Sequence, residues 1–232
     1  MYLIFLVIAV LGYKRITADT KQSKGHDETV IGIKSRANFH ALLILSMSYL
    51  LCWIPYSQWS TTVASFTQEI GISLSKYSLL WTINGALIVL GQPLLNGMLK
   101  LVLKSIKQQI IIGIGIFIVS FWVLSQAESF SGFLAAMAIL TIAEMFVWPA
   151  VPTIAFDLAP KGREGFYQGI INSTATGGRM IGPLLGGVIV DLYSMGTLFI
   201  ILIVLFMMAI LAILVYDRKL KTAVTNAVQR QV

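Results

Sequence analysis

Six long runs of apolar residues constrain this chain more than any other feature of its sequence. Each run has about 19 or more mostly apolar residues, enough for a helix rising ~1.5 Å per residue to cross a hydrocarbon core ~30 Å thick. In lipid these runs must be helical, because every backbone polar group must be paired within its own segment. The expected spans are residues 39–66, 77–99, 108–126, 132–156, 167–190 and 197–216.

The composition fits a membrane protein and excludes other broad classes. Hydrophobic residues make up 57% of the 232 residues and charged residues only 12%, whereas a soluble domain carries roughly 25% charged residues. So little charge cannot cover a water-facing surface, and the chain is too apolar to be disordered. The net charge of +7 does not indicate a nucleic-acid partner, because the basic residues lie between apolar runs and not on a soluble basic face.

Sequence motifs for enzyme chemistry, metals and cofactors are absent. The single cysteine, Cys52, excludes an intrachain disulfide, and together with His26 and His40 it offers too few ligands for a metal site. There is no nucleophile elbow, zinc-protease motif or phosphate-binding loop. We therefore expect no enzyme activity, no cofactor and no metal.

The basic residues predict the organisation and orientation of the chain. Fifteen of the 17 Lys and Arg residues lie in connections on one side, Lys76 alone lies on the other, and Arg179 lies within a span. By the positive-inside rule, the linker at residues 14–38 and the tail at residues 217–232 are cytoplasmic. Residues 1–13 are apolar but too short to span comfortably, and we expect them to be the end of a truncated transmembrane helix.

The expected fold is therefore an all-α membrane protein of the cell membrane, with a six-helix transmembrane bundle over residues 39–216. A short sequence recurs in the second and fifth spans: residues 93–97 read PLLNG and residues 183–187 read PLLGG. These spans run in opposite directions, as an inverted repeat of three plus three helices requires. We expect the bundle to consist of two inverted three-helix repeats.

Glycine and proline follow a fixed pattern in the fifth span. Gly178, Gly182 and Gly186 recur at every fourth residue and so share one helix face, where a neighbouring backbone can approach closely. Pro183 removes a backbone donor and favours a bend. Ordinary tight packing would explain the spacing alone. The complete pattern, however, is G-x8-G-x3-G-P-x2-G-G, over Gly169, Gly178, Gly182, Pro183, Gly186 and Gly187.

This pattern resembles the antiporter motif of the major facilitator superfamily, which is typical of its drug:proton antiporters. Residues 157–169, DLAPKGREGFYQG, resemble the cytoplasmic connection between helices ten and eleven of these proteins. Residues 82–85 and 91–93 resemble their helix eight. The resemblance covers essentially all of residues 38–232. It implies a multi-pass transporter with the lipid bilayer, a small-molecule substrate and protons as partners.

Two departures from the family pattern indicate which half of such a transporter is present. The antiporter motif usually occupies helix five, but here the preceding basic linker places it in helix eleven. The family's G-x-x-x-D-R-x-G-R loop is absent, since residues 100–109 have lysines but no Asp-Arg pair. We therefore expect a C-terminal six-helix half, whose partner is either a missing N-terminal half or a second copy of the chain.

Two ionisable residues lie near the middle of predicted spans, where charge is costly and function is the default hypothesis. Glu144 lies in the fourth span and Arg179 in the fifth. Because ionisation is unfavourable in a low dielectric, Glu144 could load and release a proton, or it could contact a cationic substrate. The alternative is a structural hydrogen bond or a Glu144–Arg179 pair that joins two helices.

Polar and aromatic residues also form stripes on two predicted helices. Aromatic rings and amides in this arrangement can line a cavity for a flat, lipophilic cation. The alternative is helix packing, with Trp59 and Trp81 as interfacial anchors. The candidates for cavity lining are Trp53, Tyr56, Ser60, Asn84 and Gln92.

The sequence as a whole predicts a transporter, or half of one, of the major facilitator type. By resemblance it exports lipophilic drugs or other small molecules in exchange for protons. A small-metabolite permease is the alternative within this class. A non-transporting membrane subunit or an inactive truncated product is the alternative of another class.

Overall fold

The computed structural model describes residues 28–102 and 105–217. The chain divides into two compact units, residues 1–33 and 34–232. Of the first unit the structure describes residues 28–33, which are helical. The predicted truncated helix, the first part of the predicted linker and nearly all of the tail lie outside the described residues. All other described residues belong to the second unit, which contains the helical bundle.

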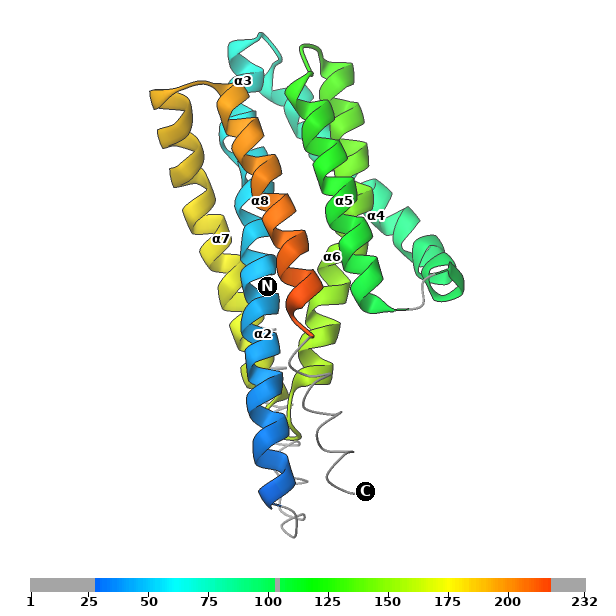
Figure 1. Cartoon of the computed structure of the whole chain (residues 1–232). Coiled ribbons are helices and arrows are strands. Elements are labelled where there is room, and N and C mark those ends of the chain that lie inside the picture. The colour runs from blue at the N-terminus through cyan, green and yellow to red at the C-terminus, as the bar shows by residue number, and fades with distance from the viewer. Residues whose placement is uncertain (1–27, 103–104, 218–232) are drawn as a thin grey trace, which may run out of the picture. The chain divides into compact units, whose positions relative to one another are not determined.

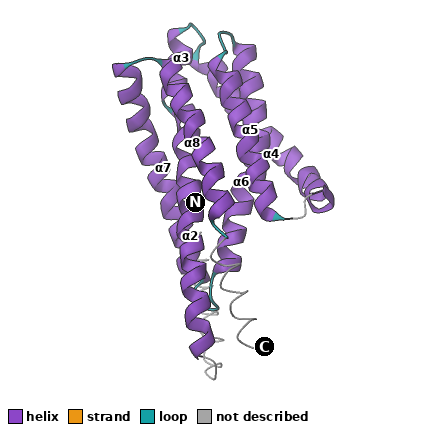
Figure 2. Ribbon diagram, viewed as in Figure 1, coloured by secondary structure: helices purple, strands orange, loops and turns teal. Residues whose placement is uncertain are grey.

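The regular structure of the described residues is entirely helical, which confirms the predicted fold class (Figure 2). Long helices run side by side, and short loops join them at the two ends (Figure 1). The helices are α2 (Glu28–Ser57), the 3-10 helix η1 (Gln58–Ser60), α3 (Thr62–Glu69), α4 (Leu74–Val102), α5 (Ile106–Ser125), α6 (Phe130–Leu158), α7 (Glu164–Leu192) and α8 (Met195–Val215).

Five of the described segments are long and apolar enough to cross a membrane: Arg36–Glu69, Leu74–Leu95, Ile106–Ser125, Phe130–Leu158 and Met195–Val215. Helix α7, which the sequence predicted as a span, is not among them. Its 29 residues are long enough, but its glycines and polar residues lower its hydropathy. It packs against α6 and α8 within the bundle, so we assign it as the sixth membrane helix.

The first predicted span is not one continuous helix, and it begins earlier than expected. Helix α2 starts at Glu28, inside the predicted linker, and ends at Ser57, where η1 and then α3 continue the crossing. Pro55 lies in the last turn of α2 and cannot donate a backbone hydrogen bond. The hydroxyls of Ser60 and Thr61 donate to the Ser57 carbonyl and compete with the helical pairing there.

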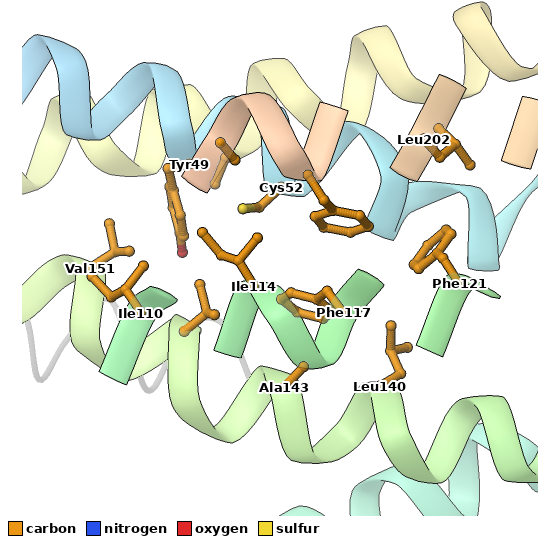
Figure 3. Packing of buried hydrophobic residues seen from close by; sticks show 14 of the residues in the cluster. Tyr49, Cys52, Ile110, Ile114, Phe117, Phe121, Leu140, Ala143, Val151 and Leu202 are labelled. Carbon is orange, nitrogen blue, oxygen red and sulfur yellow. The ribbon is translucent and has the colours of Figure 1, made fainter. Parts of the chain in front are cut away.

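The densest packing lies where α5 meets α6 and α8 (Figure 3). Phe117 of α5 stacks on Phe206 of α8 with ring centroids 5.2 Å apart, and Phe121 meets Phe206 edge-on at 5.1 Å. All three side chains are fully buried. Ser120 adds a polar link within this packing, because its hydroxyl donates to the Ala136 carbonyl of α6 at 2.8 Å.

The glycine-rich helix α7 packs through its backbone against the first membrane crossing, which consists of α2, η1 and α3. A Cβ atom on Gly182 would lie 2.7 Å from the Ile54 carbonyl oxygen and would collide with the Ser57 hydroxyl. A Cβ atom on Gly178 would collide with Trp53, and one on Gly186 with Gln58. The Gln58 amide also donates to the Gly182 carbonyl at 2.6 Å. Side chains on this glycine face would separate the two helices.

Candidate functional site

A buried carboxyl group forms the centre of the site. Glu144 lies midway along α6 and is only 3% exposed. The Asn84 amide, from α4, donates to Glu144 Oε1 at 3.1 Å and to Thr141 Oγ1 at 3.0 Å. The Thr141 hydroxyl in turn donates to the Met137 carbonyl at 2.7 Å. Asn84 is therefore a polar link between α4 and the carboxyl group of α6.

The first crossing supplies a second neighbour of this carboxyl group. The Tyr56 side chain of α2 lies beside Glu144, close enough for the two groups to interact. Residues from α2 and α4 thus meet a residue of α6 at one point inside the bundle, although each is far from the others in sequence. A buried carboxyl group needs such partners, since an unpaired polar group in an apolar surrounding costs several kcal/mol, roughly 2–7.

Next to Glu144 lies a cluster of aromatic rings from α2 and α6, which we call the aromatic cluster. Trp53 and Trp148 stack almost parallel, with centroids 4.5 Å apart. Tyr56 stands edge-on to both, at 5.2 Å from Trp53 and 5.3 Å from Trp148, and Tyr49 stands edge-on to Trp148 at 5.5 Å. Trp53, Tyr56 and Trp148 are half-buried, so part of their surface remains accessible.

Arg179 of α7 caps this cluster and does not pair with Glu144. Its guanidinium lies 4.6 Å from the centroid of the Trp53 ring, a cation–π arrangement, and the side chain is exposed. Within the described residues the ion pair that forms is a different one, Lys107–Asp217. The alternative of a Glu144–Arg179 pair is therefore not what the structure shows, because the aromatic cluster provides the partner of Arg179.

The remaining predicted cavity residues are placed less centrally. The Gln92 amide donates to the Met145 carbonyl at 3.4 Å, the carbonyl that Pro149 leaves without its helical partner. Ser60 is exposed in η1 and bonds locally to Ser57. Trp59 is fully buried, so its interpretation as an interfacial anchor is wrong; the Tyr77 hydroxyl donates to its carbonyl.

Sequence reasoning missed two members of this site, Trp148 and Thr141. Both lie on α6 beside Glu144, Trp148 four residues after it and Thr141 three before, and side chains at these spacings share a helix face. The sequence could therefore have indicated both residues as neighbours of Glu144. The structure also shows no group of three or more possible metal-ligating side chains among its described residues.

The site combines a protonatable group, flat apolar surfaces and one cation, all on helices of a membrane bundle. Comparison with known proteins places it in context. Residues 41–231 match the family model of the Major Facilitator Superfamily. An uncharacterized MFS-type transporter of Bacillus subtilis (strain 168) is 57% identical over 224 residues, which are 96% of this chain and 56% of that protein.

A second relative, an uncharacterized MFS-type transporter of Methanocaldococcus jannaschii, is 41% identical over 63 residues, 27% of this chain and 16% of that protein. The chain therefore spans little more than half the length of the Bacillus relative. The family match covers most of the chain, and it agrees with the helical bundle and its membrane-length apolar helices. This chain belongs to the major facilitator superfamily of membrane transporters.

Proposed function

We propose that this bundle is the C-terminal half of a transporter that exports lipophilic small molecules in exchange for protons. In this fold, two six-helix halves rock about a site near the bilayer midplane. The other half is either a separate or preceding N-terminal half or a second copy of this chain. On this proposal, the ends of the bundle at residues 36 and 217 face the cytoplasm, as the basic residues predict.

The observation that carries the proposal is the environment of Glu144. The carboxyl group is buried at the middle of α6, is held by the Asn84 amide, and has the uncharged Tyr56 side chain as its other neighbour. A charged partner would fix it in the ionised form, whereas uncharged partners suit both protonation states. A membrane carboxyl group that can change its charge is what coupling to protons requires.

The aromatic cluster supports the substrate class. The half-buried rings of Trp148 and Tyr56 lie close to Glu144, whereas Trp53 has one face on Trp148 and the other under the Arg179 guanidinium. Flat lipophilic cations bind aromatic rings by stacking and cation–π attraction. In the exchange cycle, the substrate and the proton compete for the neighbourhood of one carboxyl group, so that binding of one releases the other.

Arg179 favours a second candidate, a permease for an anionic metabolite. Its guanidinium occupies the Trp53 face and has no carboxylate partner among the described residues. An exposed arginine on a membrane helix is suited to a carboxylate or phosphate group of a substrate. The two candidates differ in the sign of the charge that the aromatic cluster accepts.

Two probes of matched size and opposite charge separate these candidates. The chain is purified in lipid nanodiscs, and quenching of tryptophan fluorescence is measured with tetraphenylphosphonium and with tetraphenylborate. The export proposal predicts saturable quenching by the cation, lost in Trp148→Phe and retained in Trp122→Phe. Trp122 is the matched control because it lies on α5 and is 61% exposed.

Proton release is measured in the same titration with a pH dye in weak buffer. The proposal predicts that cation binding releases protons from the unaltered chain and not from Glu144→Gln. Saturable binding of the anion alone, lost in Arg179→Gln, overturns the proposal in favour of the anionic permease. Saturable binding of neither probe overturns both and favours a non-transporting subunit or an inactive product.

A further inference from the structure

A basic cavity lies apart from the aromatic cluster, between the first part of α2 and the start of α7. It has a volume of about 370 Å³. Arg36 and His40 line it from α2, and Arg163 lines it from the residue that precedes α7. All three side chains are exposed. Positions 36 and 40 are one helical turn apart, so α2 presents its two basic groups on one face.

Three aromatic rings form the apolar part of the cavity. Phe39 stacks on Phe166 with centroids 6.5 Å apart, and both rings meet Tyr167 edge-on, at 6.4 and 6.2 Å. Tyr167 is buried at 2% exposure, whereas Phe166 is 58% exposed and Phe39 is 37% exposed. The cavity therefore has a buried aromatic base, and its outer rings are open to the surroundings.

The charge of the cavity is not neutralised by its described lining. Those lining residues include no Asp or Glu. The nearest acidic residue in sequence, Glu164, accepts a hydrogen bond from the Gly162 backbone at 3.0 Å and so turns to its own loop. The cavity also adjoins the first turn of α7, a helix of 29 residues, whose N-terminal dipole adds positive potential.

The position of the cavity identifies the source of its ligand. Leu158 is the last residue of the apolar helix α6, and the Asn38 amide, two residues after Arg36, donates to the Leu158 carbonyl at 2.8 Å. The cavity thus lies at the boundary of the apolar zone, the depth at which headgroups of lipids meet aromatic and basic side chains. Basic pockets between membrane helices at this level bind anionic headgroups.

We propose that this cavity binds the phosphate of an anionic phospholipid, with Arg36 and Arg163 holding the phosphate oxygens and the phenyl rings covering the glycerol and upper acyl chain. Arginine suits this role because its planar guanidinium matches phosphate with two parallel hydrogen bonds. His40 adds a further nitrogen donor at the same opening. The inference is independent of the transport proposal, because it concerns lipid binding and not the substrate.

The test uses the whole chain in a neutral detergent and titrates short-chain lipids by calorimetry. Dihexanoyl phosphatidylglycerol is the probe, dihexanoyl phosphatidylcholine is the neutral-headgroup control, and inorganic phosphate tests the free-anion source. We expect dihexanoyl phosphatidylglycerol to bind more tightly than either dihexanoyl phosphatidylcholine or inorganic phosphate. Each arginine contributes about a fivefold difference in affinity, since one basic residue near an anionic lipid is worth ~1 kcal/mol.

Variants separate the cavity from general surface charge. Arg163→Gln weakens binding about fivefold, Arg36→Gln with Arg163→Gln weakens it about 25-fold, and Arg163→Lys restores part of the loss. Lys161→Gln is the matched control, because it removes one charge from the same loop but does not line the cavity. An equal loss in Lys161→Gln overturns the proposal, as does unchanged binding by the double variant. Equal affinity for inorganic phosphate overturns the lipid assignment.

Discussion

The bundle has two sides that are held together by different means. On the apolar side, α5, α8 and the adjoining face of α6 meet through large, fully buried side chains such as Phe117 and Phe206. On the polar side, α2, α4 and α7 meet their neighbours through glycine backbones and hydrogen-bonding side chains. Proline follows the same division in part: α2, α4 and α7 each contain one, α5 and α8 contain none, and α6, which has a face on each side, contains two.

This difference indicates which contacts between helices can be exchanged and which resist displacement. Interdigitated rings give a close-packed region that resists partial displacement. Hydrogen bonds to backbone carbonyls and smooth glycine faces can be exchanged for others at lower cost, and proline interrupts the helical pairing that would stiffen the backbone. The candidate site belongs to the polar side. In the most apolar 18-residue stretch of α4 only 11% is buried, whereas 50% of the corresponding stretch of α6 is buried.

The largest effect is expected from a side chain that blocks the backbone contact between α7 and α2. Gly182→Leu places a branched side chain where the Ile54 carbonyl and Ser57 already lie, so we expect loss of folded protein from the membrane. The matched control is Gly187→Leu, five residues along the same helix, because a Cβ atom there has no neighbour within 4 Å. Membrane yield and protease resistance are the measurements. Equal behaviour of the two variants would show that α7 is not held by its glycine face.

A smaller but clear loss is expected from a truncation on the apolar side. Phe117→Ala removes a fully buried ring and should lower the free energy of unfolding by about 3–5 kcal/mol. Val119→Ala serves as the control on the same helix, since Val119 is 50% exposed. Unfolding in mixed detergent micelles measures both. A loss below that of the control would mean that the apolar side is no more tightly packed than the lipid-facing surface.

A third prediction separates the partners of Glu144. We expect Asn84→Ala and Glu144→Ala to be coupled by roughly 0.6–1.7 kcal/mol, between the average and the largest value measured for hydrogen bonds between membrane helices. Arg179→Ala and Glu144→Ala should show additive losses, because the two side chains form no ion pair. Double-mutant cycles of unfolding free energy give both values. Strong coupling of Glu144 to Arg179 would restore the ion-pair interpretation.

The smallest difference concerns two serines on α2 that differ by one hydrogen bond. The Ser48 hydroxyl donates to the Ala209 carbonyl of α8 at 2.9 Å, whereas the buried Ser46 hydroxyl has no partner among the described residues. Ser48→Ala should cost about 0.6 kcal/mol. Ser46→Ala should be neutral or slightly stabilising, because it removes an unpaired polar atom. A greater cost for Ser46→Ala would contradict this ranking.

The sequence predicted the helices well because their cause is local. A run of apolar residues in lipid has no alternative to a helix, so five of the six expected spans correspond to apolar membrane-length segments. Helix α7 was predicted as the remaining apolar run, but its glycines and polar residues keep it from being among these segments. The break after Ser57 was not foreseen, since it depends on hydroxyl groups that compete for carbonyls within a stretch that is apolar throughout.

The candidate site was predicted in its members but not in its pairings. Glu144 and Arg179 are conspicuous in sequence because charge is rare in a span, and their opposite signs suggested a pair. Their actual partners, Asn84 and Trp53, depend on how α4, α6 and α7 are placed around one another. Such long-range placement is not written in any single segment. Trp148 differs, because it lies four residues after Glu144 on the same helix and that spacing could have indicated it.

The two hydrogen bonds of Asn84 link the charge of one carboxyl group to the contact between two helices. The Asn84 Nδ2 group donates to Glu144 Oε1 and to Thr141 Oγ1, so that both bonds join α4 to α6. Hydrogen bonds to an ionised acceptor are about twice as strong as those to a neutral one. If Glu144 takes up a proton as proposed, the bond from Asn84 to the carboxyl group weakens while its bond to Thr141 is unchanged, and α4 is the helix that responds.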